Sequence, residues 1–192
     1  MIIFMRIIHL NSNISSGGAA TSALALHHNM LSQGLKSQIL NFKENEKNVK
    51  VIKIPTIFRL VSKVLEIFFS NFNTKYQKEI LSYNIIPTSV GLYLKRKIKR
   101  SDILIIHWFG RELISFNELT KLDCKKILIV HDLWFCGGAS HVDINKPASI
   151  LEGYHSKCKT QFLKNMNHIV TPSEFMFLNM ANIKGVNPVF FR

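Results

Sequence analysis

Two short, wholly apolar segments, each followed by a histidine, constrain the fold of this chain more than any other feature. The first covers residues 103–106 and precedes His107, and the second covers residues 127–130 and precedes His131. Four apolar residues in succession are typical of a strand that is buried on both faces, as in a parallel sheet. Ligands bind where the strands of such a sheet end. We therefore expect both histidines at one edge of a parallel sheet, where they are candidates for chemistry.

The rest of the chain alternates between strand and helix patterns. Residues 5–10 predict a strand, residues 19–33 a helix that ends at Gly34, and residues 38–42 a second strand. Such a unit has parallel strands and a right-handed crossover. Further strands are predicted at 49–54, 103–107, 127–131 and 168–171, and further helices at 57–72, 88–99, 116–122, 150–166 and 174–181. The pattern predicts one α/β domain with a Rossmann-like, doubly wound parallel sheet over residues 1–192.

The charge of the chain limits its partners. Lys and Arg number 25 against 12 Asp and Glu, which gives a formal charge of +13. This excess favours an anionic partner: nucleic acid, an acidic membrane surface or a phosphorylated ligand. Nucleic acid rests on charge alone, because no aromatic-rich RNA-binding strand is present, and we expect it least. No segment has the roughly 18 apolar residues that a membrane-spanning helix needs, so any membrane contact is expected to be peripheral.

Two helical segments allow a second interpretation. The apolar residues of 57–72 recur every three or four positions, which is typical of a helix packed on a sheet, but the same face could enter a membrane interface. The basic segment 95–100 is either a solvated helix end or a site for anionic lipid or nucleic acid.

The three cysteines predict neither a disulfide framework nor a zinc site. Cys124, Cys136 and Cys158 are odd in number, widely spaced and without a CxxC pair. This usage fits a reducing cytosol. We expect no bound metal and assign no nucleophilic role to Cys136.

The turn after the first strand carries the paired glycines Gly17 and Gly18. Glycines let the backbone approach a ligand, and the free amides at a helix start favour phosphate or carboxylate. The dinucleotide fingerprint G-x-G-x-x-G and the P-loop lysine pattern are both absent, which argues against NAD enzymes and P-loop NTPases. The alternative is a tight turn that needs glycine for its backbone angles.

Several side chains are expected near this loop. In a doubly wound sheet the strand ends converge on the cleft that also receives the first loop, so His131, His107 and the glycines can face one ligand. Asp132 could orient His131, accept a sugar hydroxyl, or cap the next turn. Trp108 and Trp134 could stack on a sugar ring, although core packing is the stronger interpretation for Trp134.

In their order along the chain, these motifs resemble the amino-terminal half of family 4 glycosyltransferases, in particular the branch that makes colanic acid and other bacterial surface polysaccharides. The resemblance covers nearly the whole chain. The matching motifs are Ser16-Gly17-Gly18-Ala19-Ala20, Leu26-His27, Ile106-His107-Trp108, His131-Asp132-Leu133-Trp134 with Gly137-Gly138, and Ile169-Val170-Thr171-Pro172-Ser173. The stretch from Trp134 to the glycine pair is one residue shorter than the family pattern.

The resemblance implies a GT-B enzyme that transfers a sugar from a nucleotide-sugar, with retention of configuration and no essential metal. Gly17 and Gly18 match the loop near the donor diphosphate, and His131 matches a histidine near the transferred sugar and is the candidate catalytic residue. His107 and Trp108 match a motif at the cleft.

The family also has a carboxy-terminal donor-binding domain, which this chain, ending at Arg192, is expected to lack. The leading hypothesis is therefore the acceptor-binding domain of a glycosyltransferase of bacterial surface polysaccharide synthesis. It would act on a lipid-linked or polysaccharide acceptor at the cytoplasmic face of the membrane, with a separate carboxy-terminal domain as a possible partner. The alternative is a catalytically inactive binding or regulatory module, or a truncated remnant, with the same fold.

Overall fold

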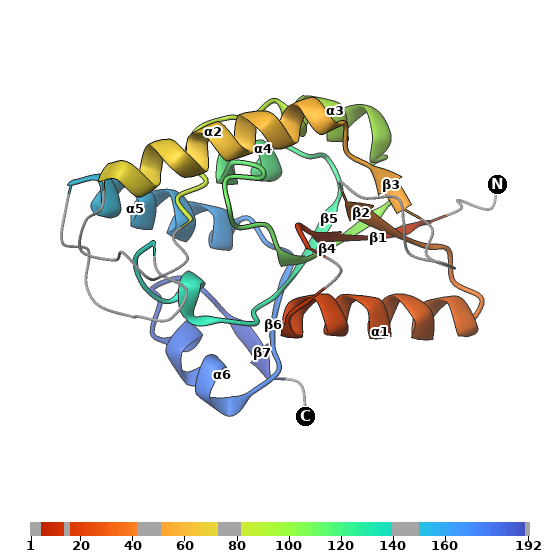
Figure 1. Ribbon diagram of the computed structural model, residues 1–192. Coiled ribbons are helices and arrows are strands. Elements are labelled where there is room, and N and C mark those ends of the chain that lie inside the picture. Colours follow the sequence, from red (N-terminus) through yellow and green to blue (C-terminus); the bar gives the residue numbers. More distant parts are fainter. Residues whose placement is uncertain (1–4, 14–15, 42–50, 73–81, 140–149, 191–192) are drawn as a thin grey trace.

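In the part of the chain that the structure describes, a seven-stranded, all-parallel sheet forms the centre (Figure 1). The structure is a computed structural model that describes residues 5–13, 16–41, 51–72, 82–139 and 150–190. The strand order is β3-β2-β1-β4-β5-β6-β7. The strands are β1 (Ile7–Asn11), β2 (Ser37–Asn41), β3 (Val51–Lys53), β4 (Ile103–Trp108), β5 (Lys125–Ile129), β6 (His168–Thr171) and β7 (Pro188–Phe190). This is the Rossmann-like, doubly wound α/β fold that the sequence predicts.

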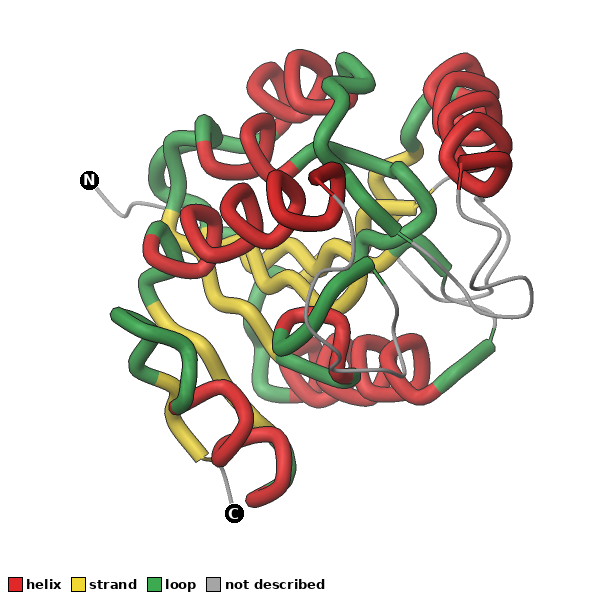
Figure 2. Tube along the Cα trace, turned by 90° about the vertical axis from the view of Figure 1, so that its left-hand side faces the viewer, coloured by secondary structure: helices red, strands yellow, loops and turns green. Residues whose placement is uncertain are grey.

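Helices cover both faces of the sheet, as the tube view shows (Figure 2). They are α1 (Gly18–Ser32), α2 (Thr56–Phe72), α3 (Val90–Lys97), α4 (Phe116–Thr120), α5 (Ile150–Lys164) and α6 (Glu174–Ala181), with a 3-10 turn η2 (Leu133–Phe135). The chain leaves β1 toward β2 and leaves β4 toward β5, in opposite directions across the sheet. Right-handed crossovers then place α1 on one face and α4 and α5 on the other (Figure 1). The reversal between β1 and β4 is the position where such sheets bind ligands.

The predicted elements are present, most of them shifted by a few residues at their ends. The strand β7 was not predicted, because Pro188 and only two further residues form it. The strand β5 ends at Ile129, so His131 lies in the following loop rather than on the strand. Phe42, residues 49–50 and Ser15 of the glycine loop lie outside the described residues.

Apolar strand side chains and a cluster of aromatic rings make up the core. All five residues of β1 are buried, as expected for a central parallel strand. Beyond the ends of β4 and β5, Trp134 is fully buried and its Nε1 donates to the carbonyl of Ser82 at 2.8 Å. Its ring stacks on Phe116 and meets Phe109 edge to face. Trp134 is therefore a core residue, which confirms the stronger of the two interpretations of its sequence position.

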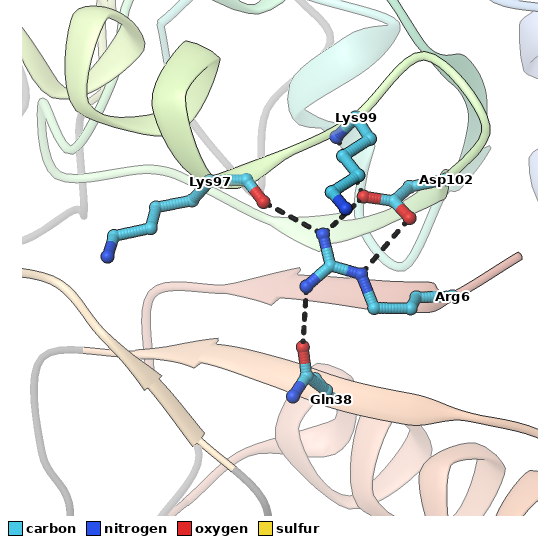
Figure 3. Close-up of polar contacts among 5 residues, drawn as sticks. All are labelled: Arg6, Gln38, Lys97, Lys99 and Asp102. Carbon is cyan, nitrogen blue, oxygen red and sulfur yellow. Dashed lines mark hydrogen bonds and ion pairs between the residues drawn. The ribbon is translucent and has the colours of Figure 1, made fainter. Parts of the chain in front are cut away.

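At the amino ends of the strands, Arg6 forms hydrogen bonds with several neighbouring segments (Figure 3). Arg6 Nε and Nη2 donate to the two carboxylate oxygens of Asp102 at 3.1 and 2.6 Å. Arg6 Nη2 also donates to the carbonyl of Lys97 at 2.8 Å, and Nη1 donates to Gln38 Oε1 at 3.4 Å. Since Asp102 is buried and also accepts from the amide of Lys99 at 2.8 Å, this cluster fixes the start of β4 beside β1.

The helix α2 does not place its apolar stripe against the sheet. It lies at the outside of the molecule, above α4 and α5 in Figure 1. Within residues 56–70 of α2, whose burial the structure describes, the exposed apolar side chains on one face are Ile57, Leu60, Val61, Val64, Ile67 and Phe68. A second face, with Phe58, Ser62, Leu65 and Phe69, turns inward. The expectation that this stripe packs on the sheet is wrong, because the smaller inward face provides the contacts.

Among the described residues, no helix is long and apolar enough to cross a membrane.

Candidate functional site

A pocket of about 680 Å³ lies at the carboxyl ends of β1 and β4 and beside the loop after β5. It brings together Gly17, Gly18, Trp108, His131 and Asp132, five of the six residues predicted for the site. The sixth, His107, does not line the pocket but contacts His131, which does. The remaining lining residues are Asn11, Ser12, Asn13, Ser16, Ala19, Ala20, Arg59, Lys63, Glu66, Gly110, Arg111 and Leu113.

The glycine loop presents the start of α1 to the pocket. Gly17 has φ of +96°, a conformation that requires glycine, and it caps α1 without a side-chain hydrogen bond. A Cβ at either Gly17 or Gly18 would meet no atom within 4 Å, so the space above both is open. Uncapped amides at a helix start, with the helix dipole behind them, attract an anion. Gly17 is therefore needed for the turn, and the turn leaves open space, while anion binding at this loop stays a prediction.

Two buried polar atoms beside this loop have no partner in the described part of the chain. They are Asn11 Oδ1 and Ser12 Oγ, where β1 ends. Asn11 is 1% exposed, and its Nδ2 donates to the carbonyl of Asn13 at 2.8 Å. Buried polar groups are nearly always paired, so the pocket beside these two atoms is suited to a ligand with hydroxyl or other polar groups.

Among the described residues, three cations line the pocket. Arg59 and Lys63 come from a third face of α2, one turn apart, and Arg111 follows β4. Arg111 Nε lies 3.9 Å from the Glu66 carboxylate, and this contact is partly exposed. These three residues could not be recognised as site residues in the sequence, because they belong to no motif and the whole chain is basic.

The backbone at Arg111 is held in an unusual conformation. Arg111 and Glu112 both have left-handed φ values, 58° and 54°, which non-glycine residues rarely adopt. The buried Glu112 carboxylate accepts from the amides of Tyr83 and Asn84 at 2.6 and 2.7 Å. Burial raises the pKa of Glu112 to about 7, although these two amides act in the opposite direction. Such paired left-handed residues are costly and often lie at functional sites, and here they aim Arg111 at the pocket.

The indole of Trp108 lies against Gly110. A Cβ at Gly110 would lie 2.7 Å from a ring carbon of Trp108 and 2.7 Å from Ser82 Oγ. Only glycine leaves this space. Trp108 thus forms part of the pocket wall, where an aromatic face can stack on a sugar ring.

Behind the pocket, imidazoles form a chain through the sheet. His131 Nε2 lies 3.2 Å from His107 Nδ1, and His107 Nε2 lies 3.0 Å from His9 Nδ1. His9 Nε2 lies 3.1 Å from Ser37 Oγ, which lies 2.7 Å from Nδ1 of His27 on α1. His9 and His27 were not predicted site residues. The alternation of β1 places His9 on a buried face beside β4, but the sequence alone does not show which histidine it meets.

Burial keeps these histidines neutral. It lowers the pKa of His9 to about 4, with a contribution from His27, and that of His107 to about 2, with contributions from His9 and His131. Burial also lowers the pKa of His131, while the carboxylate of Asp132 acts in the opposite direction. A neutral imidazole has one N–H donor and one acceptor nitrogen.

Asp132 lines the pocket and also caps η2, since its Oδ1 accepts from the amide of Trp134 at 3.1 Å.

A buried lysine stabilises the Gly137-Gly138 turn. Lys159 Nζ donates to the carbonyls of Gly137 and Gly138 at 2.8 and 2.7 Å and to that of Trp134. Lys159 was not predicted, because a lysine in an amphipathic helix normally faces solvent.

The three cysteines are free thiols. Burial raises the pKa of Cys136 to about 11, against the role of a nucleophile. Within the ranges that the structure describes, no group of three or more His, Cys, Asp or Glu side chains could hold a metal ion.

No known protein family matches the sequence, and no curated protein does. Among solved structures, a hypothetical protein from Pyrococcus horikoshii aligns over 97% of this chain and 70% of its own length, at 13% identity and a TM-score of 0.22. A score this low carries no argument about fold or function, so the function rests on the pocket itself.

Proposed function

We propose that this domain binds a nucleotide-sugar in the pocket at the strand ends and serves sugar transfer by a GT-B type glycosyltransferase of bacterial surface polysaccharide synthesis. The observation that carries the proposal is the meeting of an uncapped helix start, three cations, an indole face and His131 in one pocket. Each group suits a different part of such a ligand.

The anionic part of the ligand would lie between the glycine loop and the cations. A diphosphate needs N–H donors and positive charge, which the loop at Gly17 and Gly18 and the side chains of Arg59, Lys63 and Arg111 supply. When the sugar leaves the donor, negative charge grows on the diphosphate, and the same groups would stabilise it.

The transferred sugar would lie over Trp108 and near His131. An aromatic face stacks on the apolar side of a sugar ring, and an imidazole or carboxylate hydrogen-bonds its hydroxyls. His131 is the proposed catalytic residue, through contact with the sugar, and Asp132 offers a second hydrogen-bonding group. The other side of the cleft would come from a second Rossmann-like domain, as the GT-B resemblance implies. No metal is required in this proposal.

The acceptor would be a lipid-linked saccharide or a growing polysaccharide, reached at the cytoplasmic face of the membrane. The outward face of α2 supports this, because it exposes apolar side chains such as Leu60 and Val64 at 58% and 66%. Arg59 and Lys63 lie on the neighbouring face of the same helix, toward the pocket. An amphipathic helix with flanking cations binds at an anionic lipid interface, which would bring a lipid-linked acceptor beside the pocket.

A transfer assay tests the proposal. The protein is incubated with radiolabelled UDP- and GDP-sugars and a lipid extract, with and without a GT-B donor-binding domain supplied in trans, and label in the lipid or polymer fraction is counted. Label that depends on the protein and is lost in His131→Ala supports the enzyme. Binding of nucleotide-sugar without transfer in either arm identifies the alternative, a binding or regulatory module with this fold. The absence of both binding and transfer would overturn the proposal.

A further inference from the structure

The chain of buried imidazoles reaches from the interior of α1 to the pocket and ends on His131. Its four links measure between 2.7 and 3.2 Å and join His27, Ser37, His9, His107 and His131. The ring planes of His9 and His107 differ by 28° and those of His107 and His131 by 18°, so the three rings lie nearly parallel and meet nitrogen to nitrogen.

Neutral rings in such a chain have only two possible arrangements. Each link between two imidazoles needs one N–H and one bare nitrogen, and each neutral ring supplies one of each. If His9 donates from Nδ1 to His107, then His107 must donate from Nδ1 to His131. In the reverse arrangement every ring donates from Nε2 instead. The proton position on one ring therefore fixes the proton position on the next.

The far end of the chain favours one arrangement. His27 Nε2 is buried and has no hydrogen-bond partner in the described residues. A bare nitrogen without a partner is less costly than a buried N–H without one. His27 then carries its proton on Nδ1 and donates to Ser37 Oγ, and the Ser37 hydroxyl donates to His9 Nε2.

The same arrangement determines the tautomer at the pocket end, because the His107–His131 link passes through Nε2 of His131. With Nε2 of His131 occupied by the N–H of His107, the remaining proton of His131 lies on Nδ1.

We propose that Ser37, His9 and His107 are positioning residues that hold His131 as the Nδ1–H tautomer, so that it offers a hydrogen-bond donor, and not a base, to a ligand in the pocket. The partner of that donor is an oxygen with a lone pair. If the pocket binds a nucleotide-sugar, as proposed above, that oxygen belongs to a sugar hydroxyl or a phosphate. The tautomer itself does not depend on which ligand binds.

Nitrogen-15 NMR of the ligand-free protein tests this directly. In histidine labelled with ¹⁵N, the protonated and bare ring nitrogens have well-separated chemical shifts, and their couplings to the ring protons distinguish Nδ1 from Nε2. At pH 7.5 we expect His131, His107, His9 and His27 all to be protonated on Nδ1. The exposed His168 is the internal reference for a ring outside the chain. A proton on Nε2 of His131 would overturn the inference.

The variant Ser37→Ala tests transmission along the chain. Ser37 lies two rings away from His131, so only the intervening imidazoles can carry its effect. We expect the His131 ring nitrogens to move toward an average of the two tautomers. The matched control is Ser62→Ala, which removes a buried hydroxyl that bonds to the Glu112 carbonyl, outside the chain.

An unchanged His131 spectrum in a folded Ser37→Ala protein would also overturn the inference, and amide spectra establish the fold. Because both measurements use protein without ligand, their failure is distinct from a failure to bind nucleotide-sugar.

Discussion

His9 Nδ1 and His107 Nε2 lie 3.0 Å apart on neighbouring strands, both within the buried interior of the sheet. Two charged imidazoles cannot occupy this position, because each would place an N–H and a positive charge against the other. The contact excludes charge on both rings at once, and burial disfavours charge on either ring, which has a measurable consequence in acid.

We predict that His9 makes the fold less stable as the pH falls from about 6.5 toward 4. The unfolded chain takes up a proton on His9 near pH 6.5, whereas burial lowers its pKa in the folded protein to about 4. Between these values the unfolded state binds more protons, so the free energy of unfolding decreases by about 1.4 kcal/mol per pH unit.

The variant His9→Gln isolates this effect from other titrating groups such as Glu112. Urea unfolding of both proteins is measured from pH 7.5 to 4.5. The stability advantage of the wild type over the variant should shrink as the pH falls. Parallel pH profiles for the two proteins would show that His9 titrates normally in the fold.

The contact between Gly110 and Trp108 predicts a steric effect at the pocket wall. In Gly110→Ala the new methyl group would lie 2.7 Å from the indole and from Ser82 Oγ, so the ring must move. We expect a loss of about 1–3 kcal/mol in the free energy of unfolding and a shifted tryptophan emission spectrum. Gly153→Ala is the control: it lies within α5 with open space around it and should stabilise the protein by about 0.5–1 kcal/mol. Equal effects of the two substitutions would refute the packing account.

The Arg6 cluster predicts a loss of stability without a loss of binding. Asp102→Asn leaves Arg6 without its charge partner, and because this pair is only partly buried the loss should be about 1.5–3 kcal/mol, as for hydrogen bonds to charged groups. Asp123→Asn is the matched control, since its pair with Arg100 is more than four-fifths exposed and 3.8 Å long. That change should stay within about 0.5 kcal/mol. Ligand affinity should be unchanged in both variants, because the cluster lies at the other end of the strands; weaker binding in Asp102→Asn alone would contradict this separation.

The outward face of α2 predicts binding to anionic vesicles. Leu60→Asp places a charge in the apolar face and should weaken binding to phosphatidylglycerol vesicles about tenfold in co-sedimentation. Leu178→Asp on α6 is the control, with 56% exposure against 58% for Leu60. Neither change should alter the unfolding free energy by more than about 1 kcal/mol. Equal binding of both variants would exclude α2 as the membrane contact.

Much of the fold could be predicted from the sequence because its signals are local. Wholly apolar strands such as residues 103–106 indicate a parallel sheet, and the glycine at position 34 marks the end of α1. The orientation of α2 could not be predicted in this way. Its largest apolar stripe faces outward, whereas the smaller face with Phe58, Ser62, Leu65 and Phe69 turns inward. Periodicity identifies the stripe but not what covers it.

The site was only partly predictable for a similar reason. His131 and the glycine pair follow strand ends, and topology brings such positions together. Arg59 and Arg111 reach the pocket through the path of α2 and through a left-handed turn, neither of which has a distinct sequence pattern. His9 is found only when the register of β1 against β4 is known.

The central claim, that the pocket holds the diphosphate of a nucleotide-sugar, is tested most directly by equilibrium binding. Calorimetric titration of UDP- and GDP-sugars should show saturable binding that free nucleoside and free sugar lack. Arg111→Gln should weaken it about tenfold, since it removes a charge-assisted contact, whereas Arg96→Gln on the exposed side of α3 should not change it. Absence of binding by every diphosphate ligand, or binding that Arg111→Gln leaves intact, would contradict the account.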